Sequence, residues 1–175
     1  MRLSKDCIYY RVDAGNRRGL SFGHLYRCME ISSELYTTHG LESTFVMRDI
    51  KEGVEVARKR GVEVISFPEE TSIADEISLL SEIDGKVFIF DLTDTEVRNF
   101  IPFHQIGKKT VALDDFGNKS IGTQILINGS IVTKTHKYFA SGVSDQKRYI
   151  GPEYCIIGKK FAPAQREFVA EFPEK

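Results

Sequence analysis

One stretch decides the fold: Arg11-Val12-Asp13-Ala14-Gly15-Asn16-Arg17-Arg18-Gly19-Leu20-Ser21-Phe22-Gly23-His24-Leu25-Tyr26-Arg27. It follows an apolar strand pattern at residues 7–10 and leads into an amphipathic helix pattern that begins at His24. The loop between the two is longer than the about 2–6 residues that such connections usually have. This length favours a functional loop over a plain turn.

The loop and the helix start have the composition of an anion-binding site. Gly19 and Gly23 lack a Cβ atom, so a ligand can approach the backbone closely. Ser21 is expected to be the N-cap, which places His24 in the first helical turn. Free N–H groups and the helix dipole favour negative charge there. The alternative is that the glycines only turn the chain, since neither G-x-G-x-x-G nor a P-loop pattern is present.

Composition narrows the class of protein. The chain has 175 residues, 41% of them hydrophobic, enough for one domain with a proper core. Its net charge of −1 does not indicate binding to nucleic acid or to an anionic membrane. The three cysteines have no CxxC spacing, the histidines have no metal-ligand spacing, and no run approaches the length of a membrane span. We therefore expect a cytoplasmic protein without a metal or cofactor.

Strand and helix patterns alternate along most of the chain. Further strands are expected at residues 44–47, 62–67, 87–90, 110–113 and 124–127, and helices at 24–39, 51–60, 72–83 and 94–106. Residues 130–146 show no period and are expected to be loop. This alternation predicts an α/β fold with a doubly wound, mainly parallel sheet of about six or seven strands.

Polar side chains follow four of these strands at the point where each strand ends. They are Asp13, Asp91, Asp114 and Asn128. Ligands of doubly wound sheets bind at the carboxyl ends of the strands, where the strand order reverses. With the order 3-2-1-4-5-6, Asp13, Asp91 and the loop that ends at His24 share one crevice. Two neighbouring acids, Asp94 and Asp115, are better explained as a helix cap and a turn former.

Five segments together resemble a known family. They are Arg11-x-Asp13, Ser21-Phe22-Gly23-His24-x-x-Arg27, Leu113-Asp114-Asp115-x-Gly117-Asn118, Ile127-Asn128-Gly129-Ser130 and Gly151-Pro152-Glu153-Tyr154. In this order they are similar to the N-terminal domain of the UDP-2,4-diacetamido-2,4,6-trideoxy-beta-L-altropyranose hydrolases of pseudaminic acid biosynthesis. Those enzymes have the GT-B fold and are related to MurG-like glycosyltransferases. The chain departs from the hydrolases at Asp91-Leu92-Thr93, where they tend to carry an aromatic residue.

The resemblance implies an architecture and a partner. Residues 1–160 correspond to a Rossmann-like domain, one half of a GT-B fold, and residues 161–175 to the start of a linker. The second half, which carries most of the nucleotide contacts, is not in this sequence. The expectation is therefore that the chain alone binds UDP-sugars weakly and hydrolyses them little. It would self-associate or recruit a separately encoded C-terminal domain.

The resemblance also implies roles for individual residues. His24 corresponds to the critical histidine, which activates water against the anomeric carbon without a metal, and Asp13 would orient the ring or the water. The helix N-terminus is expected to keep the His24 imidazole neutral near pH 7. The substrate-binding candidates are Gly19, Ser21, Phe22, Gly23, Arg27, Asp91, Asp114 and Asn128. Two other readings stay open: a nucleotide-sugar glycosyltransferase, in which His24 faces a sugar hydroxyl, and a non-catalytic half.

Overall fold

Seven parallel strands form the frame of the computed structural model, which describes residues 7–17, 19–132 and 135–158. The expected tail at 161–175 lies outside these residues. The strands are β1 (Ile8–Val12), β2 (Ser43–Arg48), β3 (Glu63–Phe67), β4 (Val87–Asp91), β5 (Lys109–Leu113), β6 (Ile125–Asn128) and β7 (Lys147–Ile150). Their order is β3-β2-β1-β4-β5-β6-β7, and every neighbouring pair is parallel. The expected α/β, doubly wound sheet is confirmed, with the reversal of strand order between β1 and β4.

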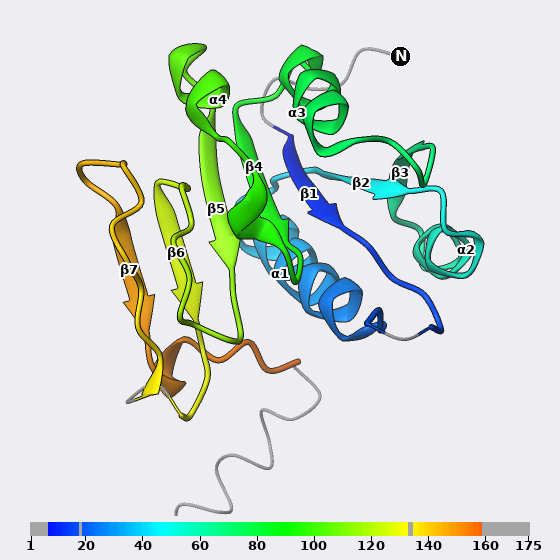
Figure 1. Cartoon of the computed structure of the whole chain (residues 1–175). Coiled ribbons are helices and arrows are strands. Elements are labelled where there is room, and N and C mark those ends of the chain that lie inside the picture. The colour runs from blue at the N-terminus through cyan, green and yellow to red at the C-terminus, as the bar shows by residue number, and fades with distance from the viewer. Residues whose placement is uncertain (1–6, 18, 133–134, 159–175) are drawn as a thin grey trace, which may run out of the picture.

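Helices cover both faces of the sheet (Figure 1). The helices α1 (Gly23–His39) and α2 (Lys51–Lys59) pack on one face. The helices α3 (Ile73–Glu82) and α4 (Ile101–Gln105) pack on the other. Two short 3₁₀ turns, η1 (Thr95–Val97) and η3 (Pro152–Tyr154), lie in the connections after β4 and β7. This is the three-layer arrangement of a Rossmann-like fold.

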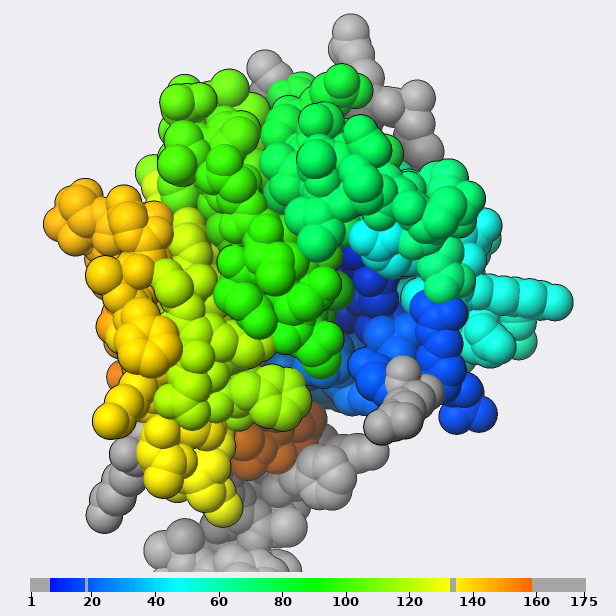
Figure 2. Space-filling view, in the orientation of Figure 1, coloured from blue at the N-terminus to red at the C-terminus, as the bar shows by residue number. Residues whose placement is uncertain are grey.

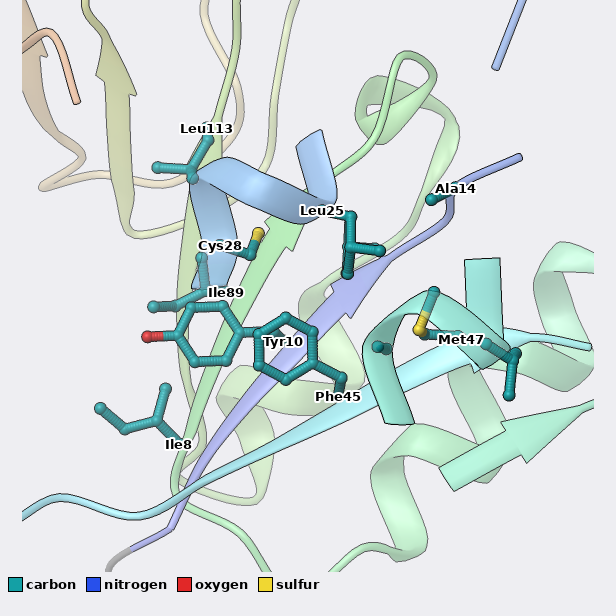
Figure 3. Close-up of a cluster of buried hydrophobic side chains, with 12 residues drawn as sticks. Ile8, Tyr10, Ala14, Leu25, Cys28, Phe45, Met47, Ile89 and Leu113 are labelled. Carbon is teal, nitrogen blue, oxygen red and sulfur yellow. The ribbon is translucent and has the colours of Figure 1, made fainter. Parts of the chain in front are cut away.

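Alternation along the central strands divides the core into two layers. On β1, Tyr10 and Val12 point toward α1 and α2, where they join Leu25 and Cys28 (Figure 3). The intervening residue Tyr9 joins the opposite layer with residues of α3 and α4. Because side chains on a strand alternate between faces, a shift of one residue moves a group to the other side of the sheet. This rule also decides which polar side chains meet at the carboxyl edge.

The region expected as a helix over residues 94–106 is instead two short pieces, η1 and α4. Pro102 lies in the first turn of α4 and has no N–H to donate to a preceding turn, so a continuous helix cannot pass through it. Arg98 between the pieces has an extended backbone, and its guanidinium turns inward to Glu76.

Two further features differ from the sequence expectation. The N-cap of α1 is Phe22 rather than Ser21, and the Ser21 hydroxyl accepts only a long bond of 3.4 Å from the Gly23 N–H. Residues Lys147–Ile150 form an edge strand, β7, that periodicity did not reveal because three of its four residues are exposed and polar or aromatic. The expected C-cap of α1 is confirmed, since Gly40 has φ +68°.

Candidate functional site

The carboxyl ends of β1 and β4 carry two acids that face opposite sides of the sheet. In the register of these strands Val12 is paired with Asp91, so both side chains lie on the α1 face. Asp13 is one residue further along and lies on the α3 face, where it contacts Arg11. The predicted proximity is correct for Asp91 and His24, whose side chains are in direct contact. It is wrong for Asp13, which bonds to other groups.

Three side chains on one face of α1 surround the Asp91 carboxylate. His24 Nδ1 lies 2.6 Å from Asp91 Oδ1, and Arg27 bonds to both Asp91 oxygens through Nε at 2.8 Å and Nη2 at 2.6 Å. The Cys28 thiol donates to Asp91 Oδ2 at 3.5 Å. These residues are spaced i, i+3 and i+4, the spacing that places side chains together on a helix surface. Asp91 itself is 1% exposed.

The contacts of Asp91 fix its charge and the tautomer of His24. Burial raises the pKa of Asp91, but hydrogen bonds from His24 and Arg27 outweigh it and hold this pKa below 3.8. The ionised carboxylate can only accept, so His24 Nδ1 carries the proton and Nε2 is left as the acceptor. Within the part of the chain that the structure describes, no group bonds to Nε2, and the ring is 18% exposed.

The pKa of His24 moves in the direction opposite to the sequence expectation. The hydrogen bond to Asp91 raises this pKa above 6.5, against a smaller lowering by burial and by the Arg27 cation. The expected direction, a pKa lowered by the dipole of the helix N-terminus, is wrong because a carboxylate at 2.6 Å acts far more strongly than a partial charge. The arrangement is an imidazole oriented by a buried carboxylate, His24 against Asp91.

Arg27 links this pair to a second carboxylate, Asp115. Its Nη1 and Nη2 donate to Asp115 at 2.5 and 3.0 Å, while the same side chain holds Asp91. Sequence reasoning treated Asp115 as a turn former and missed this contact. The sequence carried no clear signal for this contact, because Asp115 lies in a bend beyond the end of β5, where strand alternation no longer fixes the direction of a side chain.

Asp13 belongs to a network of buried ions on the α3 face. Arg11 is fully buried and bonds to Asp13 at 2.6 and 2.8 Å and to Glu76 at 3.1 Å. Arg98 and Arg48 also bond to Glu76, and the Arg48 backbone N–H donates to Asp13 at 2.8 Å. Asp13 thus ties β1 to β2 instead of contacting the His24 ring.

Asp114 and Asn128 form a third cluster, which does not include His24 or Asp91. The Tyr138 hydroxyl donates to Asp114 at 2.6 Å, and the Asn128 amide lies 2.6 Å from the same hydroxyl and 3.1 Å from His136 Nδ1. Asp114 further accepts from the Gly117 N–H at 2.7 Å. These contacts connect the loops after β5 and β6. The four strand-end residues are therefore at one edge, as predicted, but they divide into three clusters.

The glycine loop reaches the site through the start of α1. Gly19 has φ +80°, a conformation that favours glycine, in a turn closed by the Leu20 N–H on the Arg17 carbonyl. Phe22 is half-buried against the core and stacks on Tyr26 at 6.2 Å. Gly23 is exposed at the first helical position, immediately before His24. The expectation that these residues bind substrate stays a prediction.

A pocket of about 190 Å³ lies beside Arg27, at the ends of β5 and β6. The segment after β7 closes one side and crosses this edge of the sheet below α1 (Figure 1). Its lining comprises Arg27, Leu113, Asp114, Asp115, Ile127, Gly129, Ser130, Tyr154, Cys155 and Ile156. In the space-filling view the same segment is partly visible below the ends of these strands (Figure 2).

The fold and the edge site define a class: a Rossmann-like α/β protein with a histidine–aspartate pair at the reversal of strand order. No protein-family model matches the chain, and no curated protein matches it. Among residues 7–17, 19–132 and 135–158, no cluster of three or more histidine, cysteine or acidic side chains is arranged to hold a metal ion. No helix in these residues has the length and apolar character needed to cross a membrane.

Proposed function

We propose that the chain is a metal-independent nucleotide-sugar hydrolase with His24 as its base. The observation that carries the proposal is the contact of His24 Nδ1 with the buried Asp91 carboxylate, which leaves Nε2 as the acceptor of a partly exposed ring at the strand switch point. The substrate class, a UDP-linked diacetamido-trideoxyhexose, rests on the resemblance of the sequence to hydrolases of pseudaminic acid biosynthesis.

The proposed reaction is one displacement at the anomeric carbon. His24 Nε2 takes a proton from water as the water oxygen bonds to the anomeric carbon with inversion. The bond from that carbon to the phosphate oxygen breaks, and its electron pair leaves with UDP. Asp91 stabilises the imidazolium that forms and keeps the ring in the tautomer that can accept. Arg27 holds Asp91 in place through both oxygens.

The start of α1 supports a role toward the leaving diphosphate. Its first turn contains no acidic residue, so the N–H groups at the helix start, where Gly23 makes only the long bond to Ser21, keep their attraction for anions. Three free thiols, at Cys7, Cys28 and Cys155, fit a reducing cytoplasm, where nucleotide sugars are made. The proposal includes a partner, either a second domain or a second copy of the chain, that would supply contacts to the nucleotide.

The test is a single-turnover assay with protein in excess over a UDP-diacetamido-trideoxyhexose, so that slow hydrolysis by the chain alone is measurable. Proton NMR follows UDP and the anomer of the free sugar. We expect UDP release that His24→Ala abolishes and His39→Ala leaves intact, since His39 is exposed at the far end of the same helix. Equal rates for wild type and His24→Ala would contradict the proposal. If the sugar were recovered only as a glycoside of an added alcohol, the activity would be glycosyl transfer instead of hydrolysis.

A further inference from the structure

The pocket beside Arg27 adjoins the proposed base without containing it. Arg27 lines the pocket, and its Nη2 lies 3.2 Å from His24 Nδ1. A group bound in the pocket is therefore one arginine side chain away from the imidazole. The volume of about 190 Å³ is below the about 300–1,000 Å³ of sites that enclose drug-sized ligands. The pocket has room for one ring, not for a whole nucleotide sugar.

The charge of the lining argues against a phosphate. Arg27 is the one basic side chain that lines it within the described residues, and it donates four hydrogen bonds to Asp91 and Asp115. A guanidinium has five N–H donors, so little of it is left for a ligand. The lining carries two carboxylates, Asp114 and Asp115, against this one guanidinium, and only the Asp114 carboxylate has a further cation, Lys119, at 3.7 Å among the described residues. Asp115, 41% exposed at its side chain, can still accept from a ligand hydroxyl or amide.

The remaining walls suit the carbon face of a sugar ring. Leu113, Ile127 and Ile156 supply apolar surface, and Tyr154 adds an aromatic ring. The Ser130 hydroxyl adds a second polar group. Gly129 fixes this wall, because a Cβ there would lie 2.5 Å from the Cys155 Cα, so the two backbones are in direct contact. Apolar walls with few polar groups are typical of sites that orient a small uncharged ligand.

We infer that this pocket binds the uncharged pyranose ring of the substrate, through hydroxyl or amide donors to Asp115, and leaves the phosphates outside. The orientation of the anomeric carbon toward His24 rests on the proposed function. The binding of an uncharged pyranose is independent of the proposed function, because it is argued from the residues that line the pocket.

Cys155 provides a direct readout. It is exposed in the pocket, whereas the other two cysteines of the chain, Cys7 and Cys28, are buried. The rate of its alkylation by N-ethylmaleimide, followed by mass spectrometry, reports access to the pocket. The probes are methyl N-acetylglucosaminide, an uncharged pyranose with an amide, and UDP alone.

We expect the pyranose to slow alkylation about fivefold at about four times its dissociation constant, since the free fraction of sites sets the rate. UDP alone should leave the rate unchanged. The control is Cys155→Ser with Ser78→Cys, which moves the reactive thiol to an exposed position on α3; neither probe should protect it.

Two results would overturn the inference: protection by UDP but not by the pyranose, or no protection by the pyranose up to its solubility limit. The readout needs no turnover. Pyranose protection without UDP-sugar hydrolysis would therefore contradict only the proposed function, and hydrolysis that depends on His24 without protection would contradict only the pocket.

Discussion

Two ion clusters lie at the ends of β1 and β4, separated by the thickness of the sheet, and they differ in how completely they are closed. On the α3 face, Arg11 and Glu76 are fully buried and Asp13 is 8% exposed, with Arg48 at the rim 17% exposed at its side chain. On the α1 face, His24 and Arg27 have side chains 18% and 21% exposed, above a buried Asp91. The closed cluster pairs its carboxylates with arginines, whereas the open one keeps an acceptor nitrogen on His24. We therefore expect the closed cluster to contribute to stability and the open cluster, with its free acceptor nitrogen, to contribute to the proposed reaction.

The largest expected effect is on catalysis at the open cluster. His24→Ala should lower the single-turnover rate by about 10²–10⁴, the contribution typical of a general base. Its thermal unfolding should change little, because the ring is partly exposed and its polar contacts among the described residues are with Asp91 and Arg27. Calorimetry beside the assay separates the two quantities. An unfolded variant would show that the open cluster also maintains the fold.

The next effect is on stability at the closed cluster. Glu76→Gln should lower the free energy of unfolding by about 3–5 kcal/mol, because it leaves the buried Arg11 and Arg98 without their shared carboxylate. Asp94→Asn is the matched control, since Asp94 also pairs with Arg98 but is 54% exposed, and should cost at most about 1 kcal/mol. Urea unfolding measures both.

The shifted pKa of Glu76 leads us to expect that the free energy of unfolding depends on pH. Burial raises its pKa, but hydrogen bonds and charges from Arg98 and Arg11 lower it from 4.5 to about 2. A depressed carboxyl pKa stabilises the fold fully above pH 4.5, and this contribution is lost as the pH falls from 4.5 to about 2. Glu76→Gln should lack this part of the acid sensitivity. An unchanged acid profile in the variant would contradict the assignment.

A smaller effect is expected on the titration of His24. Asp91 raises the pKa of His24 above 6.5, so the rate should rise with pH through a value above 6.5, where the ring becomes neutral. In Asp91→Asn the opposing influence of the Arg27 cation remains, and the pH midpoint should move lower. NMR titration of the ring measures this without turnover. An unchanged midpoint would mean that Asp91 does not set the charge of His24.

The smallest effect is expected at Asp115. Its side chain is 41% exposed, so Asp115→Asn should change the free energy of unfolding by about 0.2–1 kcal/mol. The pH midpoint of His24 should move only slightly, since Asp91 makes the direct contact. A large loss of stability would show that the open cluster is as tightly coupled as the closed one.

The sequence predicted the layers of the fold because long apolar runs such as residues 87–90 and helical periods carry that information locally. It also placed Asp91 and His24 at one edge. It could not assign the partner of His24, since Asp13 and Asp91 are equivalent in a strand-end pattern and only the register of β1 with β4 separates their faces. The predicted direction of the His24 pKa shift was wrong for the same reason. This pKa depends on a contact between residues 67 positions apart in the sequence.

The position of β1 has a consequence for how the chain folds. This strand is buried along its whole length and pairs with β2 on one edge and β4 on the other. The second partner is remote, because Ile8 pairs with Val87. During synthesis, the β4-facing edge of β1 stays open until β4 is made, which exposes an apolar strand edge that other chains can pair with. Non-local parallel pairing of this kind also slows folding. The strand that ends at the candidate site is therefore paired on both edges only once β4 has been made.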